Sequence, residues 1–181
     1  DARQGDSDLR RQLLLGTTLA TSAFLGGYRG YVRRAYADCT GAGGTYVCSG
    51  AMVTRQVLSG TPLTVTTTPG FSITVPAFDA FHLGGTGGVS FIDLNHSAIT
   101  GEIGITAANN PGVADLTITT TGTVTGTTGD GIYAVAAPGT TGRVTINAAT
   151  VSGGGYHGIR AVHDGDGDIT ITATGTVTGT K

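Results

Sequence analysis

The chain has 181 residues, of which 12% are charged, and it contains 32 glycines and no tryptophan. A composition this poor in charge and this rich in glycine excludes a helical bundle, and the alternating runs of Val, Ile and Thr exclude a disordered chain. The charge is unevenly divided, because residues 1–37 hold six Arg against three Asp, whereas residues 38–181 hold four basic and nine acidic residues. The acidic body has no basic face for phosphates, so nucleic acid is excluded as a partner.

Residues 1–37 have the features of an export signal. Two arginines, in the sequence RRQLLL, precede an apolar stretch over residues 13–25, and Ala35 and Ala37 put small residues at the two positions that a signal peptidase reads. The apolar stretch is too short, and too often interrupted by Gly and Thr, for a membrane span of about 20 residues. We therefore predict a helical signal-like segment that is removed after Ala37. A competing cleavage site in ATSA (20–23) and an uncleaved leader that anchors the chain remain as alternatives.

Two cysteines follow the leader directly. Cys39 and Cys48 are separated by eight residues in the Gly-rich sequence DCTGAGGTYVCSG, and an exported protein reaches an oxidising compartment in which a disulfide persists. A metal site needs several ligands close together, and no His or further Cys lies near these two residues. We predict a Cys39–Cys48 disulfide within a cap region over residues 38–62, with free thiols or a metal site as the less favoured readings.

Three short segments recur over residues 63–181 with a period of about 26 residues. The first begins at Leu63, Val89, Leu116, Val144 and Ile169, the second is centred on Ile99, Val124, Val151 and Val177, and the third begins with Gly-Ile at 104, 131 and 158. Three strand-like segments per period, separated by Gly-rich turns, are typical of a β-solenoid in which each repeat makes one coil. The sequence thus predicts an all-β fold of about 4–5 coils.

Alternation along each strand predicts which side chains face inward. The first residues of the first segment form one inward ladder, and the residues two places further on form a second: Val65, Phe91, Ile118, Ile146 and Ile171. Outward Thr117, Thr145 and Thr170 then form a hydroxylated ladder on the outer surface, where β-branched side chains suit the pleat. This arrangement explains why a chain with so little charge contains so much threonine.

The same register places charged and aromatic side chains one above another. Asp115, Arg143 and Asp168 share a column in which acidic and basic residues alternate. Tyr133 and Arg160 share another, in which a cation–π contact is expected. Both columns are interpreted as structural.

The leader, the paired-cysteine segment CTGAGGTYVCSG and the Gly/Thr-rich coils together resemble the N-terminal part of bacterial autotransporters, the type V secretion class, particularly those of alphaproteobacteria. The resemblance spans nearly the whole chain, and its distinctive parts are Cys39–Gly50 and the coil pattern over 63–179. It implies a secreted passenger folded as a right-handed parallel β-helix, with a C-terminal outer-membrane β-barrel that translocates it. The barrel strands match no position here, and the sequence stops midway through a coil, so we expect a truncated portion of a longer passenger.

Candidate chemistry is sparse. Asp164, Asp166 and Asp168 in HDGDGD alternate as in the opening of a calcium loop, but no downstream bidentate Glu follows, so a solvated turn is favoured over a calcium site. A carbohydrate-active enzyme of β-helical fold would need paired carboxylates, for which Asp93, Glu102, Asp130 and the 164–168 group are the candidates. A serine protease is excluded because no GxSxG motif occurs, and His157 has no evident acid or nucleophile partner.

The sequence therefore predicts no catalytic residue, no cofactor and no metal site. The expected function is that of a cell-surface or secreted passenger, a structural and adhesive stalk whose repeated Thr-rich faces suit weak multivalent contacts. Its expected partners are host glycans, extracellular matrix or neighbouring cells. The alternatives are a polysaccharide-active β-helix enzyme and a membrane-anchored solenoid with an uncleaved leader.

Overall fold

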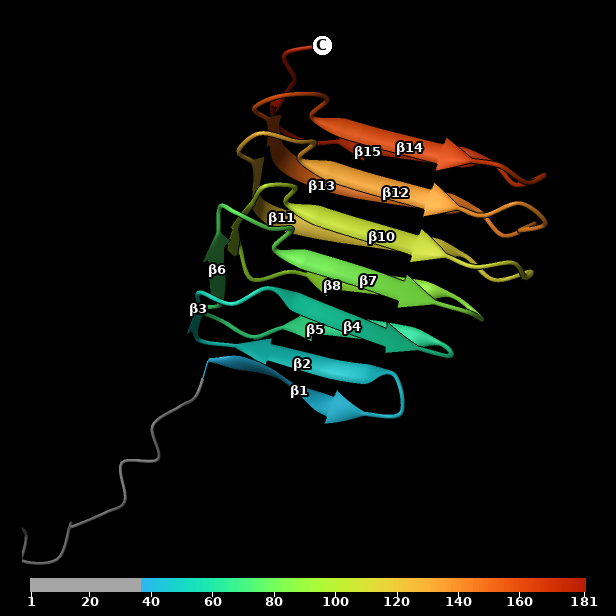
Figure 1. The fold of residues 1–181 in the computed structure, drawn as a ribbon, viewed down its shortest axis with the longest axis horizontal. Helices are drawn as coiled ribbons and strands as arrows, with labels where there is room; N and C mark the ends of the chain where they lie inside the picture. The colour runs from blue at the N-terminus through green and yellow to red at the C-terminus, as the bar shows by residue number, and fades with distance from the viewer. Residues whose placement is uncertain (1–36) are drawn as a thin grey trace, which may run out of the picture. The chain divides into compact units, whose positions relative to one another are not determined.

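The computed structural model describes residues 37–181 as a parallel β-solenoid of about five turns (Figure 1). The described residues contain no helix, and therefore none that is long and apolar enough to cross a membrane. The predicted helical signal, with its peptidase position Ala35 and the competing cleavage site at 20–23, lies outside the described residues. Ala37, the predicted cleavage position, is the first described residue and packs half-buried against the core.

Each of the first five coils contributes one strand, or part of one, to each of three faces, and the last coil contributes to two of them. These faces are called the first, second and third sheets. The first sheet contains β2 (Thr45–Ser49), β5 (Leu63–Thr67), β8 (Val89–Asp93), the first part of β11 (Leu116–Gly126), the first part of β13 (Val144–Gly153) and β15 (Ile169–Ala173). The second contains β3 (Ala51–Met52), β6 (Ser72–Val75), β9 (Ala98–Gly101), the second parts of β11 and β13, and β16 (Val177–Thr178). The third contains β4 (Gln56–Gly60), β7 (Phe81–Gly85), β10 (Ile105–Asn109), β12 (Ile132–Ala136) and β14 (Ile159–His163). Strands β11 and β13 bend around the corner between the first two sheets, with a shift of register between Thr120 and Thr123. They thereby join the first two into one 11-stranded hydrogen-bonded sheet beside the 5-stranded third.

The predicted ladders are confirmed. Leu116 pairs with Val89 on one side and Val144 on the other, and Ile118 pairs with Phe91 and Ile146, so the aliphatic columns are superimposed in parallel register. These side chains are buried because alternate residues of each strand point to the same face. The outward column of Thr117, Thr145 and Thr170 is also in register, as predicted.

The final coil is less enclosed than the others. Ile169 and Ile171 continue the two inward columns in register, yet they are 43% and 47% exposed, because no further strand lies against them within the described residues. Aromatic rings fill the interior nearer the N-terminal end of the stack. The Phe81 ring packs edge-on against Phe91, with ring centroids 5.0 Å apart, and so joins the third sheet to the first.

The N-terminal end begins with a hairpin. Strand β1 (Asp38–Ala42) is antiparallel to β2, and the two-residue loop of Gly43 and Gly44 has positive φ at both residues, which a type I′ turn requires. The predicted disulfide joins Cys39 to Cys48, which face each other directly in this hairpin. The parallel stack starts at β2, within the range 38–62, where the 26-residue repeat is not visible in the sequence.

Candidate functional site

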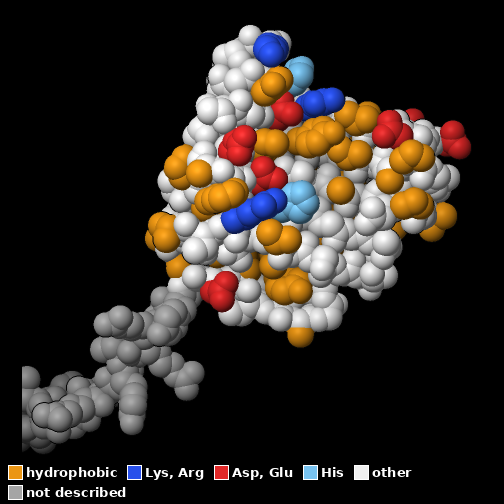
Figure 2. Space-filling model, viewed as in Figure 1, with side chains coloured by type: hydrophobic (Ala, Val, Ile, Leu, Met, Phe, Trp, Pro, Cys, Tyr) orange, Lys and Arg blue, Asp and Glu red, His pale blue; other side chains and the backbone are white. Residues whose placement is uncertain are grey.

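Two hollows on the surface lie at the corner between the second and third sheets. Most of the charged and aromatic side chains that line them come from this corner. Its connections are stacked: 53–55, 76–80, 102–104, 127–131 and 154–158. Backbone hydrogen bonds hold successive connections together, as from Gly129 N to Glu102 O at 2.9 Å and from Gly131 N to His157 O at 3.0 Å. The two hollows lie beside the three-residue connections, the first beside 53–55 and the second beside 102–104. Figure 2 shows charged and histidine side chains gathered in a column along this face.

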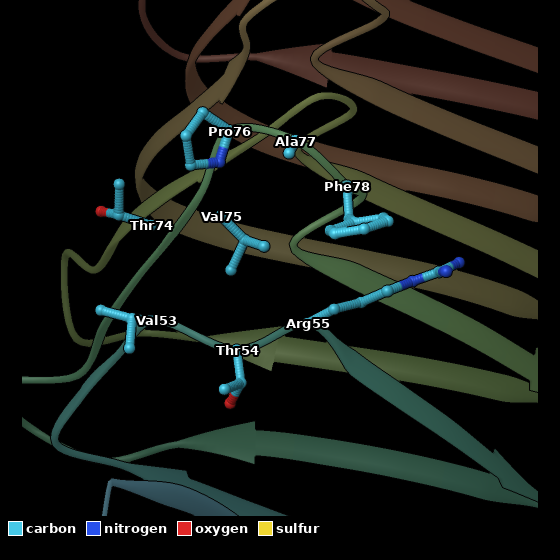
Figure 3. Close-up of a pocket in the computed structure, with 8 residues that line it drawn as sticks. All are labelled: Val53, Thr54, Arg55, Thr74, Val75, Pro76, Ala77 and Phe78. Atoms are coloured by element: carbon cyan, nitrogen blue, oxygen red, sulfur yellow. The ribbon is translucent and has the colours of Figure 1, made fainter.

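The first hollow is an apolar groove of about 490 Å³ between the connection 53–55 and residues 74–78, which are the end of β6 and the start of the next connection. In Figure 3 the Phe78 ring lies above the Arg55 side chain at one end, and Val53 and Val75 line the other. Phe78 is 55% exposed and Val53 is 78% exposed. At the charged end, Asp79 lies 3.6 Å from the Arg55 guanidinium and 3.1 Å from His82 Nδ1, so its carboxylate is already engaged within the protein.

The second hollow has a volume of about 220 Å³ and lies among the connections of the third, fourth and fifth coils. Its polar lining consists of Glu102, Thr128, Asp130, Tyr133, Tyr156 and Arg160. The Arg160 guanidinium lies over the Tyr133 ring at 4.9 Å from the centroid, which confirms the predicted cation–π contact. Residues of β12 and β14 meet here because Tyr133 and Arg160 are in register on adjacent strands.

His157 has an acid partner, contrary to our prediction. The buried carboxylate of Asp130 accepts a hydrogen bond from the His157 backbone N–H at 2.8 Å and lies 3.0 Å from its Nδ1. Both residues directly precede the Gly-Ile pair of their coils and are 27 positions apart, so the repeat itself aligns them. The contact holds the imidazole ring beside Asp130, which lines the second hollow.

Asp93 is buried at the corner between the first and second sheets, so it cannot join the other carboxylates on an outer face. Its side chain accepts hydrogen bonds from the hydroxyls of Ser97 and Thr67, both at 2.6 Å, from Thr120 at 3.1 Å, and from the backbone N–H of Asn95 and Ser97 at 3.3 Å. Burial raises the pKa of Asp93, but these hydrogen bonds outweigh it and hold the pKa below its ordinary value. Asp93 thus joins three coils through one charged group, and its place inside follows from the inward alternation of Phe91 and Asp93.

Of the carboxylates that a polysaccharide-active enzyme would need, the structure brings only Glu102 and Asp130 to one hollow. The 164–168 group lies at a different corner, between the third and first sheets, where Asp166 N donates to Thr140 O and His163 Nε2 lies 2.8 Å from Gly142 O. Within residues 37–181 no group of three or more His, Cys, Asp or Glu side chains could hold a metal ion, the 164–168 turn included.

The column of Asp115, Arg143 and Asp168 is stacked in the predicted order, since each residue precedes a strand start that pairs with the next. Asp115 accepts a hydrogen bond at 2.7 Å from the backbone N–H of Arg143, and no ion pair forms along the column within the part of the chain that the structure describes.

The chain was compared with protein-family models, with curated proteins and with solved structures, and none of them matches it.

Proposed function

We propose that this chain is the passenger portion of an exported, surface-displayed protein of the autotransporter type, a right-handed β-helical stalk that has no catalytic residues and makes adhesive contacts. The proposal is supported chiefly by the Cys39–Cys48 disulfide, which closes the hairpin at the N-terminal end of the stack. Disulfides persist in exported proteins and are rare in a reducing cytosol, so the bond favours an oxidising destination.

Two further features support a stalk. The described part of the chain is a continuous stack whose core is shared by neighbouring coils, an architecture that extends in one dimension by adding repeats. Its outer face presents columns of Thr side chains in place of charged ones. Such repeated faces suit weak multivalent contacts, whose overall affinity rises with the number of sites engaged. Host glycans, matrix or neighbouring cells are the proposed partners.

The test is to express the chain with its own residues 1–37 in a Gram-negative host and to determine the N-terminus and the thiol content of the product. We expect a product that starts at Asp38, is recovered from outside the cytoplasm, and does not react with a thiol-alkylating reagent until it is reduced. Replacement of Ala37 by Phe puts a bulky residue where the peptidase reads a small one and should prevent cleavage.

The matched control is Ala42→Phe, which places the same bulk beyond the predicted cleavage position. An uncleaved product with free thiols in the cytoplasm would overturn the proposal. An exported product that keeps residues 1–37 would instead favour the membrane-anchored alternative.

A further inference from the structure

The second hollow, lined by Glu102, Thr128, Tyr133, Tyr156 and Arg160, combines unused hydrogen-bonding groups with aromatic walls. Among the hydrogen bonds and ion pairs within residues 37–181, none uses the Glu102 carboxylate, the Thr128 hydroxyl, either tyrosine hydroxyl or the Arg160 guanidinium. Within residues 37–181, five polar side chains that make no hydrogen bond or ion pair therefore converge on one small concave surface. The first hollow lacks this feature, because its Arg55 is already paired with Asp79.

The walls of this hollow are held in place by the fold. Glu102 N donates to Phe78 O at 2.8 Å, and Gly129 N donates to Glu102 O at 2.9 Å, so the third-coil connection is tied on both sides. Gly129 allows this approach, because a Cβ there would lie 2.6 Å from Ile103 Cγ1. Arg160 is oriented by the Tyr133 ring beneath it. A site formed by stacked backbone connections loses little conformational entropy when a ligand binds.

The donors and acceptors in the hollow are mixed. The Glu102 carboxylate is an acceptor, the Asp130 carboxylate is an acceptor already engaged by His157, Arg160 is a donor, and the hydroxyls of Thr128, Tyr133 and Tyr156 can act as either. An anion would meet the Glu102 carboxylate, and a cation would meet the Arg160 guanidinium, so neither is favoured. A polyhydroxylated neutral ring matches such a lining, because each sugar hydroxyl both donates and accepts. Each tyrosine ring already has a cation over it, Tyr133 the Arg160 guanidinium at 4.9 Å and Tyr156 the Lys181 ammonium at 4.4 Å, so recognition rests on hydrogen bonds.

The volume sets the size of the ligand. At about 220 Å³ the hollow is smaller than the range of about 300–1,000 Å³ typical of pockets for drug-sized molecules. It has room for one monosaccharide unit with the rest of the glycan outside, which suits a chain end or a branch.

We propose that this hollow, the glycan corner, binds one neutral pyranose unit of an oligosaccharide, with Glu102 and Arg160 forming hydrogen bonds to its hydroxyls. The inference deepens the adhesive part of the proposed function and rests on that function only for the source of the glycan. The binding chemistry stands on the residues of the corner, whatever the route of export.

The test is a titration of the purified, disulfide-bonded chain, followed by isothermal calorimetry and by saturation-transfer NMR. The probes are lactose, cellobiose and chitobiose, with sialyllactose as the anionic arm and glycylglycine as the zwitterionic arm. We expect at least one neutral disaccharide to saturate the protein with a Kd in the micromolar to low-millimolar range. Glu102→Gln and Arg160→Gln should each weaken that binding by about tenfold or more, because each removes a charged hydrogen-bonding partner.

Matched controls repeat the same chemistry away from the corner. Arg143→Gln changes an exposed arginine at the opposite corner, and Asp164→Asn changes an exposed carboxylate of the 164–168 turn. Both should bind the sugar as the unaltered chain does. Thermal melts of all variants separate lost binding from lost folding, and Tyr156→Phe, which keeps the ring and removes only its hydroxyl, supplies a variant expected to fold.

Several results would overturn the proposal. They are no saturation by any neutral sugar up to about 10 mM, saturation by sialyllactose or glycylglycine alone, and sugar binding that the corner variants leave unchanged. None of these results bears on the location of the protein, which the cleavage and thiol measurements test separately. A failure of the glycan corner is therefore distinguishable from a failure of the proposed export.

Discussion

Replacing Asp93 with Asn tests whether a buried charge holds neighbouring coils together. The amide side chain would have nearly the same shape as the carboxylate, and its Oδ1 could still accept from Thr67, from the Ser97 hydroxyl and from Asn95 N. The other carboxylate oxygen, which now accepts from Ser97 N at 3.3 Å and from Thr120 at 3.1 Å, would become an amide nitrogen. A donor would then face the Ser97 N–H, which would be left buried without an acceptor.

The magnitude follows from these contacts. An unsatisfied buried donor costs about 1–3 kcal/mol, and turning two short charge-assisted hydrogen bonds into neutral ones costs about 1 kcal/mol each. Losing the charge also removes its desolvation cost, which offsets part of this sum. We expect Asp93→Asn to lower the free energy of unfolding by about 2–4 kcal/mol at pH 7.

The pH dependence supplies a second readout. Because the pKa of Asp93 is lower in the folded protein than in the unfolded chain, its stabilisation is present above the ordinary carboxyl pKa and is lost as pH falls through the folded pKa. The difference between the unaltered chain and Asp93→Asn should therefore shrink as pH falls from about 5 towards 2.

The assay is urea unfolding followed by far-UV circular dichroism at several pH values, with the disulfide intact. Asp115→Asn is the matched control, because Asp115 is exposed and accepts one hydrogen bond, from Arg143 N. Its free energy of unfolding should change by less than about 1 kcal/mol. A loss below about 1 kcal/mol for Asp93→Asn, or a difference that grows towards low pH, would refute the reasoning.

Four further substitutions test the stack at other points. Ile146→Ala, in the dry interior, should cost about 2–5 kcal/mol in urea unfolding, whereas outward Thr145→Ala should cost less than about 1 kcal/mol, and equal losses would contradict the assignment of inner and outer columns. Cys39→Ser should cost about 2–3 kcal/mol, given the nine-residue separation of the cysteines, and should speed amide exchange in β1; unaltered exchange there would show that the bond does not hold the hairpin. Gly129→Ala should lower the melting temperature, because the added Cβ would lie 2.6 Å from Ile103 Cγ1. The connections 102–104 and 127–131 would be forced apart at a cost of about 1–3 kcal/mol. An unchanged melting temperature would mean that these connections separate freely.

Much of the fold could be predicted from the sequence because a solenoid repeats one local rule. A strand with alternating aliphatic and Thr residues, returning about every 26 positions, can bury its apolar face only by stacking on its neighbours. The ladder of Leu116, Val144 and Ile169 could therefore be predicted from the sequence alone. The cation–π contact of Tyr133 with Arg160 followed from the same period.

The first coil was hidden because its strands depart from the repeat. Strand β3 has two residues, and β4 opens with the polar Gln56 where later coils have Phe or Ile. Only the parallel pairing with β6 and β7 identifies them as a coil. The contact of Asp130 with His157 could also have been predicted from the period, because the two residues are one repeat apart.

Periodicity by itself determined which residues stack, because strand alternation and coil length are local properties of the chain. What only the tertiary structure decided was the geometry at the corners, where connections of three and five residues lie against one another and leave hollows. The lowered pKa of Asp93 depends on nearby Ser97 and also on Thr67 and Thr120, which are about one repeat away in the chain. The polar groups around Glu102 and Arg160 likewise come from different coils. The energies of these interactions come from burial and from the direction of each hydrogen-bond donor, and neither can be read from a sequence pattern.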